Sequence, residues 1–222
     1  MFTIQFINES NHLKYYDNNQ LQNLIKYVCD TNKTFTDSVR TNPNFQGPFI
    51  GCNLCPFAKR QLLDGEVALQ QMLFNHKVHT RKVKDFAKHR VISFDPQSLV
   101  FPQDLSSLGE RIIQFYWQWN YMALYAVHAN HINPHIHVVV DAVSFQTGNA
   151  FHISFEPEYL KNITLLWWEN FEKEILLNNQ KKEIRENLLY GEIQYGHISL
   201  SCTEQIQANK LTRNKTTSKY KY

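Results

Sequence analysis

The sequence predicts an α+β fold in which a central, mainly antiparallel β-sheet is flanked by helices. Short runs rich in β-branched residues are interleaved with longer stretches whose apolar residues recur every three or four positions. Two of the β-rich runs, residues 122–129 and 135–143, are joined by the turn-forming segment Asn130-His131-Ile132-Asn133-Pro134, which is typical of a hairpin. Hydrophobic residues make up 43% of the 222 positions, enough for a substantial core.

Periodicity gives the order of the elements along the chain. Residues 18–30 carry four apolar side chains at helical spacing, which predicts one buried stripe: Leu21, Leu24, Ile25 and Val28. Strands are expected at residues 2–6, 89–95, 122–129 and 135–143, and helices at residues 18–30, 58–75, 103–120 and 157–194. Residues 31–55 are rich in Asn, Thr, Pro and Gly and are expected to be irregular. We expect one folded domain over residues 1–200 and a basic, partly disordered tail over residues 201–222.

Composition narrows the class of protein. No apolar run approaches the roughly 18–20 residues that a membrane span needs, and the N-terminus lacks the basic start and apolar stretch of a signal peptide. We therefore expect a cytoplasmic protein without membrane insertion. The four cysteines do not form the pattern of a disulfide framework, and Cys52-Asn-Leu-Cys55 supplies only half of a zinc-ribbon spacing. Buried free thiols are the expected state.

The net charge of +3 is unevenly distributed. Six basic residues lie between Asn75 and Arg90 against a single acid, and five more lie between Ile206 and Tyr222 with no acid. Such clusters are the electrostatic signature of a protein that contacts a phosphate backbone, although solvated surface segments also produce them.

The strongest chemical signal is a group of histidines around the expected hairpin. His135 and His137 are two residues apart on one strand, so their side chains lie on the same face of the sheet. His128 ends the preceding strand, and the hairpin brings it opposite them. Three converging imidazoles suit a divalent metal with open coordination positions. His131 lies in the turn itself and is expected to be exposed.

Several well-known catalytic patterns are absent from the sequence. There is no His-Glu-x-x-His motif of a zinc hydrolase, no Gly-rich phosphate loop of the Walker type and no Gly-x-Ser-x-Gly elbow. A metal site without its own general base raises the question of a nucleophile supplied elsewhere in the chain.

Three segments, in order, resemble the motifs of the plasmid relaxases, the mobilisation nucleases of the HUH endonuclease superfamily (MobA/TraI-like relaxase domain). The first is a helix with a tyrosine followed by a Lys-Thr pair, here residues 21–34 with Tyr27, Lys33 and Thr34. The second is the strand Lys88-His89-Arg-Val-Ile-Ser93-Phe94. The third is His128 followed by His135-Ile-His137, a β-run and Thr147-Gly148. Together they span roughly residues 1–155.

The resemblance implies a DNA relaxase that nicks one strand at a transfer origin and becomes linked to its 5′ end, for conjugative mobilisation of a plasmid or mobile element. It makes Tyr27 the nucleophile and His128, His135 and His137 the metal ligands. A tyrosine hydroxyl is protonated at neutral pH and hence a weak nucleophile, so a metal on the scissile phosphate would assist its attack. Without the resemblance, an ordinary boundary aromatic of its helix is the preferred interpretation of Tyr27. Tyr15 and Tyr16 are rival nucleophiles.

The resemblance also implies a cofactor and partners. The family uses Mg²⁺ or Mn²⁺, whereas three imidazoles favour Mn²⁺, Ni²⁺ or Zn²⁺ by ligand type. The substrate would be single-stranded DNA, with accessory relaxosome proteins and a coupling protein as partners. Candidate DNA-contacting residues are Lys26, Lys33, Arg81, Lys82, Lys84, His89 and Arg90.

Two departures from the family pattern concern the surroundings of the ligands. Asn130 stands where the family has an Asp after the first histidine, and Asp141 stands where it has an Asn after the β-run. Asn130 could orient a ligand histidine by accepting its ring N–H through the neutral amide oxygen. Asp141 is about 13 Å from His137 along the strand, too far to replace the carboxylate.

Three other functions remain open on the sequence. One is a rolling-circle replication initiator or transposase of the same superfamily, although these place the tyrosine after the His-x-His strand. Another is a catalytically idle DNA-binding module, whose DNA binding would be indifferent to chelation. The third is an unrelated metal hydrolase, which would turn over small phosphoesters without forming a covalent link.

Overall fold

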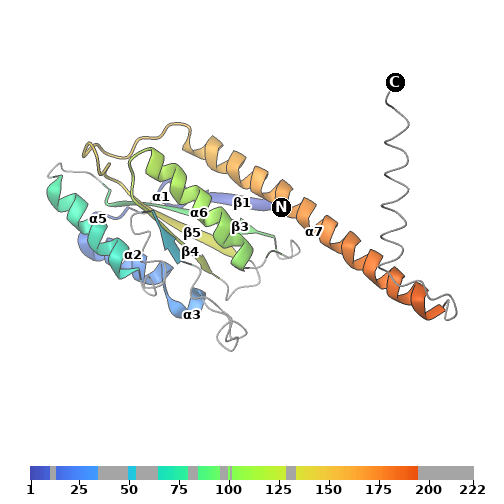
Figure 1. Ribbon diagram of the computed structural model, residues 1–222. Coiled ribbons are helices and arrows are strands. Elements are labelled where there is room, and N and C mark those ends of the chain that lie inside the picture. Colours follow the sequence, from blue (N-terminus) through green and yellow to red (C-terminus); the bar gives the residue numbers. More distant parts are fainter. Residues whose placement is uncertain are drawn as a thin grey trace, which may run out of the picture. The chain divides into compact units, whose positions relative to one another are not determined.

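The computed structural model describes residues 1–10, 14–34, 50–53, 65–79, 85–95, 100, 102–128 and 134–194. Its centre is a five-stranded, wholly antiparallel sheet in the order β1-β3-β5-β4-β2 (Figure 1). The strands are β1 (Phe2–Phe6), β2 (Ile50–Cys52), β3 (Ala87–Phe94), β4 (Ala123–His128) and β5 (His135–Asp141). The helices are α1 (Ile7–Ser10), α2 (Asn18–Val28), α3 (Thr31–Thr34), α5 (Glu66–Val78), α6 (Pro102–Gln118) and α7 (Glu156–Gln194). The α+β prediction is therefore confirmed.

Helices cover both faces of the sheet (Figure 1). On one face, α2 and α5 pack their apolar side chains against β2, β4 and β5, and this core includes Leu21, Leu24, Leu69, Met72, Leu124 and Val139. On the other face lies α6, together with the first turns of α7. Because side chains alternate along a strand, neighbouring residues of β3 and β5 belong to different layers.

Helix α2 forms for reasons visible in its sequence. The Asp17 carboxylate accepts a hydrogen bond from the Gln20 backbone N–H at 2.8 Å, which caps the helix start. The four predicted stripe residues are all buried, and the Cys29 N–H bonds the Ile25 carbonyl at the helix end. The predicted stripe is confirmed, and it leaves Tyr27 on the boundary of the helix with 47% of its surface exposed.

The structure corrects the prediction that residues 31–55 are irregular. Residues 31–34 form α3, and Ile50–Cys52 form the edge strand β2, which pairs with β4 through Ile50 and Ala126, Gly51 and Tyr125, and Cys52 and Leu124. A strand of three residues is too short to show a period, and its partner lies more than 70 positions away. The remaining predicted strands and helices are found within a few residues of their expected bounds, apart from residues 58–64, which lie outside the described part.

The chain divides into two compact units, Met1–Trp168 and the part from Glu169 onward. The first contains the whole sheet and every predicted site residue that the structure describes. The second contains the remainder of α7, on which Leu176 and Leu177 are exposed. The tail at 201–222 lies outside the described residues.

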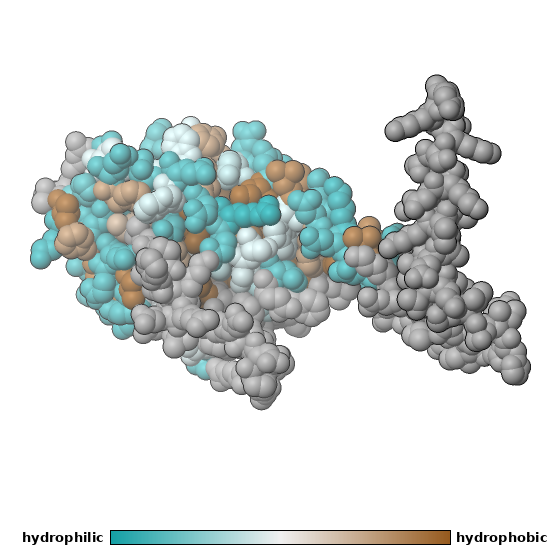
Figure 2. Space-filling view, viewed as in Figure 1, coloured by the Kyte–Doolittle hydropathy of each residue, from teal (hydrophilic) through white to brown (hydrophobic). Residues whose placement is uncertain are grey.

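Cys29 and Cys52 are buried and form no disulfide, as predicted, whereas Cys55 and Cys202 lie outside the described residues. No helix in the described part of the chain is long and apolar enough to cross a membrane. On the face shown in Figure 2, hydrophilic side chains predominate and apolar side chains form small separate patches.

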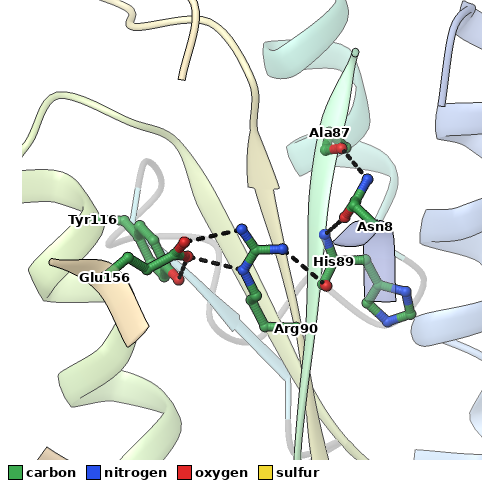
Figure 3. Close-up of polar contacts among 6 residues, drawn as sticks. All are labelled: Asn8, Ala87, His89, Arg90, Tyr116 and Glu156. Carbon is green, nitrogen blue, oxygen red and sulfur yellow. Dashed lines mark hydrogen bonds and ion pairs between the residues drawn. The ribbon is translucent and has the colours of Figure 1, made fainter. Parts of the chain in front are cut away.

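A buried ion pair links the sheet to the start of α7 (Figure 3). Arg90 is 1% exposed, and its Nε and Nη2 each donate to a Glu156 carboxylate oxygen at 2.9 Å. The Tyr116 hydroxyl donates to the same carboxylate at 2.6 Å. Burial, together with the Glu156 charge, raises the pKa of Tyr116 well above its ordinary value, so the phenol remains a donor. This network joins β3, α6 and α7.

Candidate active site

The hairpin register brings the three predicted ligand histidines together. His128 on β4 is the direct cross-strand partner of His135 on β5, and His137 lies two residues further along the same face. The nearest pair of rings, those of His128 and His137, has its centroids 4.1 Å apart, and His135 lies 5.1 Å and 5.0 Å from these two. Nitrogen atoms from all three lie within 4.8 Å of one another. The predicted convergence is confirmed; their role as ligands remains a prediction.

His128 is oriented by the helix that carries the tyrosine. Its Nε2 lies 2.9 Å from the backbone carbonyl oxygen of Val28, the last residue of α2. A carbonyl can only accept, so Nε2 carries the proton and the lone pair of this ring lies on Nδ1. The bond also satisfies a carbonyl that a helix leaves without an intrahelical partner at its C-terminal end. The same contact therefore fixes the imidazole and anchors the end of α2.

His137 has one ring nitrogen that fits a metal. Its Nε2 is buried and forms no hydrogen bond to the described residues. Its Nδ1 lies 2.8 Å from Nε2 of His89 on β3. A buried nitrogen without a partner is costly in a folded protein, and a divalent cation held by the three imidazoles would provide its missing interaction. The residues present therefore fit a metal centre.

Burial keeps the imidazoles of His89 and His137 neutral, and metal binding by His137 would require a neutral ring. Desolvation, followed by the neighbouring positive charge of Arg90, lowers the pKa of His89 to about 4. Desolvation and then the neighbouring His128 hold the pKa of His137 far below its ordinary value. Both rings consequently keep a lone pair at physiological pH.

Tyr27 lies directly beside the histidine cluster. Its ring packs edge-on against His128 and His137, with centroid separations of 5.7 Å and 5.5 Å. The ammonium group of Lys33, on α3, lies 3.6 Å from the centroid of the Tyr27 ring. A tyrosine, a cation and three imidazoles thus meet at one point, drawn from α2, α3, β4 and β5.

A cleft of about 720 Å³ opens next to this point. Helix α2 contributes Leu24 and Tyr27, and strand β3 contributes His89 and Ser93. None of the described residues that line the cleft is a carboxylate. A cation bound here would keep its full charge for an anionic substrate, and the space is sufficient for one or two nucleotide units.

The predicted DNA-contacting residues fall in different places. Lys26 is exposed on α2, and Lys33 lies over Tyr27. His89 lines the cleft but is buried, and its neighbour Arg90 points to the opposite face of the sheet, where it pairs with Glu156. Arg81, Lys82, Lys84 and Asn130 lie outside the described residues, as does His131.

Two features of the site were not predicted from the sequence. The first is the bond between His89 and His137, which are diagonal neighbours on adjacent strands. The alternation of β3 places His89 on one face, but only the pairing of β3 with β5 shows that this is the histidine face. The second is Tyr15, whose hydroxyl lies 3.2 Å from Nδ1 of His89. Burial, and then Tyr27, raise the pKa of Tyr15, which disfavours it as a nucleophile.

Asp141, expected to be too far from the ligands to support them, is engaged elsewhere. Its carboxylate lies 2.7 Å from Nε2 of His76 and accepts a hydrogen bond from Asn75 at 2.8 Å. The carboxylate therefore ties α5 to the end of β5 and takes no part in the histidine cluster.

The comparison with protein families agrees with this geometry. The family model described as relaxase, MobA/VirD2-like, nuclease domain matches residues 57–174, just over half of the chain. By class the protein is therefore a nuclease. More particularly, it belongs to the relaxase family, which confirms the resemblance seen in the sequence motifs. The matched range holds all three clustered histidines and His89, whereas Tyr27 precedes it. The comparison with curated proteins finds no match.

Proposed function

We propose that this relaxase nicks one strand of DNA at a transfer origin by transesterification, with the Tyr27 hydroxyl as nucleophile. The observation that carries the proposal is the packing of the Tyr27 ring against His128 and His137, 5.7 Å and 5.5 Å away. A half-exposed tyrosine on the rim of a cleft can reach a phosphate that the histidine cluster also faces.

In the reaction, the Tyr27 oxygen forms a bond to the scissile phosphorus while the bond from phosphorus to the 3′ oxygen breaks. Tyr27 loses its proton and the departing 3′ oxygen gains one, so the products are a 5′-phosphotyrosyl strand and a free 3′-hydroxyl. One phosphodiester replaces another, and the same site can therefore reverse the reaction without an energy source.

Two groups of the chain assist this step. The Lys33 ammonium, over the Tyr27 ring, stabilises the negative charge that develops on the phenolic oxygen during attack. The hydrogen bond from His128 to the Val28 carbonyl holds the end of α2, and hence Tyr27, against the cluster.

His128, His135 and His137 are the residues that would hold a divalent cation. When bound, this cation supplies Lewis-acid stabilisation of the charge on the scissile phosphate. Imidazole ligands favour Mn²⁺, Ni²⁺ or Zn²⁺, and the family's use of Mg²⁺ or Mn²⁺ makes Mn²⁺ the ion common to both arguments.

The substrate we propose is single-stranded DNA, and the biological role is conjugative mobilisation of a plasmid or mobile element, with accessory relaxosome proteins and a coupling protein as partners. Among the described residues, Lys26 and Lys33 are proposed to contact the phosphate backbone. The same role is proposed for Arg81, Lys82 and Lys84, which lie outside the described residues. Arg90 receives no DNA contact in this proposal, because Glu156 already engages its guanidinium.

The test uses overlapping single-stranded oligonucleotides that tile the element encoding this chain, each labelled at the 3′ end. The label belongs at that end because the tyrosine becomes linked to the downstream fragment. Wild type, Tyr27→Phe and the control Tyr16→Phe are incubated with Mn²⁺ or with EDTA and separated on a denaturing gel. Tyr16 is a suitable control because it is exposed and is not among the described cleft residues.

We expect a protein-linked band that requires Mn²⁺, persists in Tyr16→Phe and vanishes in Tyr27→Phe. A band that survives in Tyr27→Phe would contradict the proposal and transfer the role to another tyrosine. DNA binding without any linked band, unaffected by EDTA, would favour the idle DNA-binding module, and cleavage without linkage would favour a metal hydrolase.

A further inference from the structure

His128 and His137 each form a hydrogen bond through the ring nitrogen that would not bind the metal, and the two partners differ in kind. Metal-bound histidines nearly always donate their other ring N–H to a carboxylate, a carbonyl or water. For His128 this partner is the Val28 carbonyl. For His137 it is the imidazole of His89, 2.8 Å away, in a position where a carboxylate would be the usual group.

The hydrogen-bond chain through His89 determines which nitrogen of His137 is available. A metal on Nε2 of His137 requires the ring proton on Nδ1, where it is donated to Nε2 of His89. His89 must then carry its own proton on Nδ1 and donate it to the Tyr15 oxygen at 3.2 Å. In the opposite arrangement, a proton on Nε2 of His137 would be buried without an acceptor among the described residues.

The backbone around His89 is also held in place. Strand β1 ends at Phe6, opposite Arg90, so residues 87–89 of β3 extend beyond it. There the side chain of Asn8 makes hydrogen bonds to the backbone of β3 that a paired strand would otherwise make. Its Oδ1 accepts the His89 N–H at 2.6 Å, and its Nδ2 donates to the Ala87 carbonyl at 3.1 Å (Figure 3). The side chain and the backbone of His89 are thus both fixed by polar contacts.

We propose that His89, held by Asn8 and Tyr15, is the positioning residue that fixes the His137 ring in the tautomer presenting Nε2 to the metal. The inference rests on the proposed metal site and assigns His89 a role other than DNA contact. It also fits a site in which the family's carboxylate after the first histidine is replaced by Asn130, which lies outside the described residues.

The first measurement leaves the wild-type protein unaltered. ¹⁵N-labelled full-length chain is loaded with Zn²⁺, a diamagnetic probe, and the protonation of each imidazole nitrogen is determined by long-range ¹H–¹⁵N correlation spectra. The proposal requires His89 protonated on Nδ1, and His137 protonated on Nδ1 with Zn²⁺ on Nε2. A His89 ring protonated on Nε2 alone would overturn it.

The second measurement compares metal affinity in the absence of DNA. Calorimetric titration with Mn²⁺ is applied to wild type, His89→Phe, His89→Gln and the control Tyr16→Phe. Loss of such a supporting hydrogen bond typically weakens metal binding about 10–100-fold, which we expect for His89→Phe. His89→Gln keeps an amide that can accept from His137 and should recover much of the affinity, whereas Tyr16→Phe should match wild type.

The outcomes separate this inference from the proposed function. If wild type binds Mn²⁺ and His89→Phe binds equally well, the positioning role is wrong while the metal site stands. If wild type and His137→Ala bind neither Mn²⁺ nor Zn²⁺, the metal site itself is wrong. Should His89→Phe not fold, the tautomers of the Zn²⁺-loaded wild type still decide the matter.

Discussion

Arg90 offers a quantitative test of how this protein uses its basic residues. Its guanidinium forms two hydrogen bonds of 2.9 Å to Glu156, and neither side chain reaches solvent appreciably. Replacing Arg90 with Met preserves much of the apolar volume but leaves the Glu156 carboxylate in the interior without its counter-charge. Tyr116 still donates to that carboxylate at 2.6 Å, which compensates only in part.

The expected loss follows from the burial of the pair. Removing one partner of a buried ion pair typically costs about 3–5 kcal/mol, because the remaining charge is desolvated and unpaired. Total stabilities of domains are about 5–15 kcal/mol, so Arg90→Met should remove a large share of the free energy of unfolding. The double variant Arg90→Met/Glu156→Met removes both charges and should recover all but about 1–3 kcal/mol, the cost of leaving the Tyr116 hydroxyl without its acceptor.

Urea unfolding followed by circular dichroism gives these free energies. Lys88→Met is the matched control, since Lys88 lies two residues away on the same strand and its partner Asp85, at 2.8 Å, is partly exposed; its loss should be below about 1 kcal/mol. An Arg90→Met variant no more destabilised than Lys88→Met would show that the buried ion pair does not contribute the expected stability. If Arg90→Met kept its stability but bound DNA more weakly, the sequence-based expectation that Arg90 contacts DNA would be restored.

Three further predictions concern Lys33, Asp141 and His128. Lys33→Ala removes the cation from the Tyr27 ring and should slow formation of the DNA-linked protein about 5–30-fold, corresponding to about 1–2 kcal/mol. Lys26→Ala should mainly weaken DNA binding. Single-turnover rates at saturating DNA distinguish the two variants, and equal rates would contradict a role for Lys33 in the attack. Burial raises the pKa of Asp141, so the native state holds this proton more tightly than the unfolded state, and the stabilising contribution present at low pH falls as pH rises from about 4 through the folded pKa. Urea unfolding between pH 4 and 7 should therefore show Asp141→Asn gaining stability relative to wild type as pH rises, and a constant difference would argue against the buried charge. Finally, Val28 is the last residue of α2 and its carbonyl accepts from His128, so His128→Phe should increase amide hydrogen exchange at the end of α2, while His135→Phe should leave it unchanged. Equal exchange in both variants would contradict a link between His128 and the helix that carries Tyr27.

The histidine cluster could be predicted because it depends on local geometry. A strand alternates with a period of two, and a short hairpin fixes the register of its two strands, so the sequence alone places His128 opposite His135. The stripe of α2, and hence the boundary position of Tyr27, follows equally from the helical period. The family model matches residues 57–174 and independently shows membership of the relaxase family.

The features that escaped prediction depend on contacts between distant segments. In the sequence, His89 and Arg90 are two adjacent basic residues with no visible difference in role. Strand β3 directs His89 to the cleft and Arg90 to Glu156 on the opposite face. Only the packing of α2 and α7 on the sheet shows which face holds the cleft. Strand β2 is missing from the prediction because its three residues acquire a partner only through β4. The bond between Tyr15 and His89 joins residues 74 positions apart, for which no periodic pattern exists.

Identifying the residue that becomes linked to the DNA tests the proposed role of Tyr27 directly. The covalent protein–DNA product is trimmed with nuclease, digested with trypsin and sequenced by mass spectrometry. Trypsin cuts after Lys14, Lys26 and Lys33, so Tyr15 and Tyr16 fall on peptide 15–26 and Tyr27 on peptide 27–33. We expect a nucleotide linked through its phosphate on the second peptide, at Tyr27. A modification confined to peptide 15–26, or cleaved DNA with no modified peptide, would contradict it.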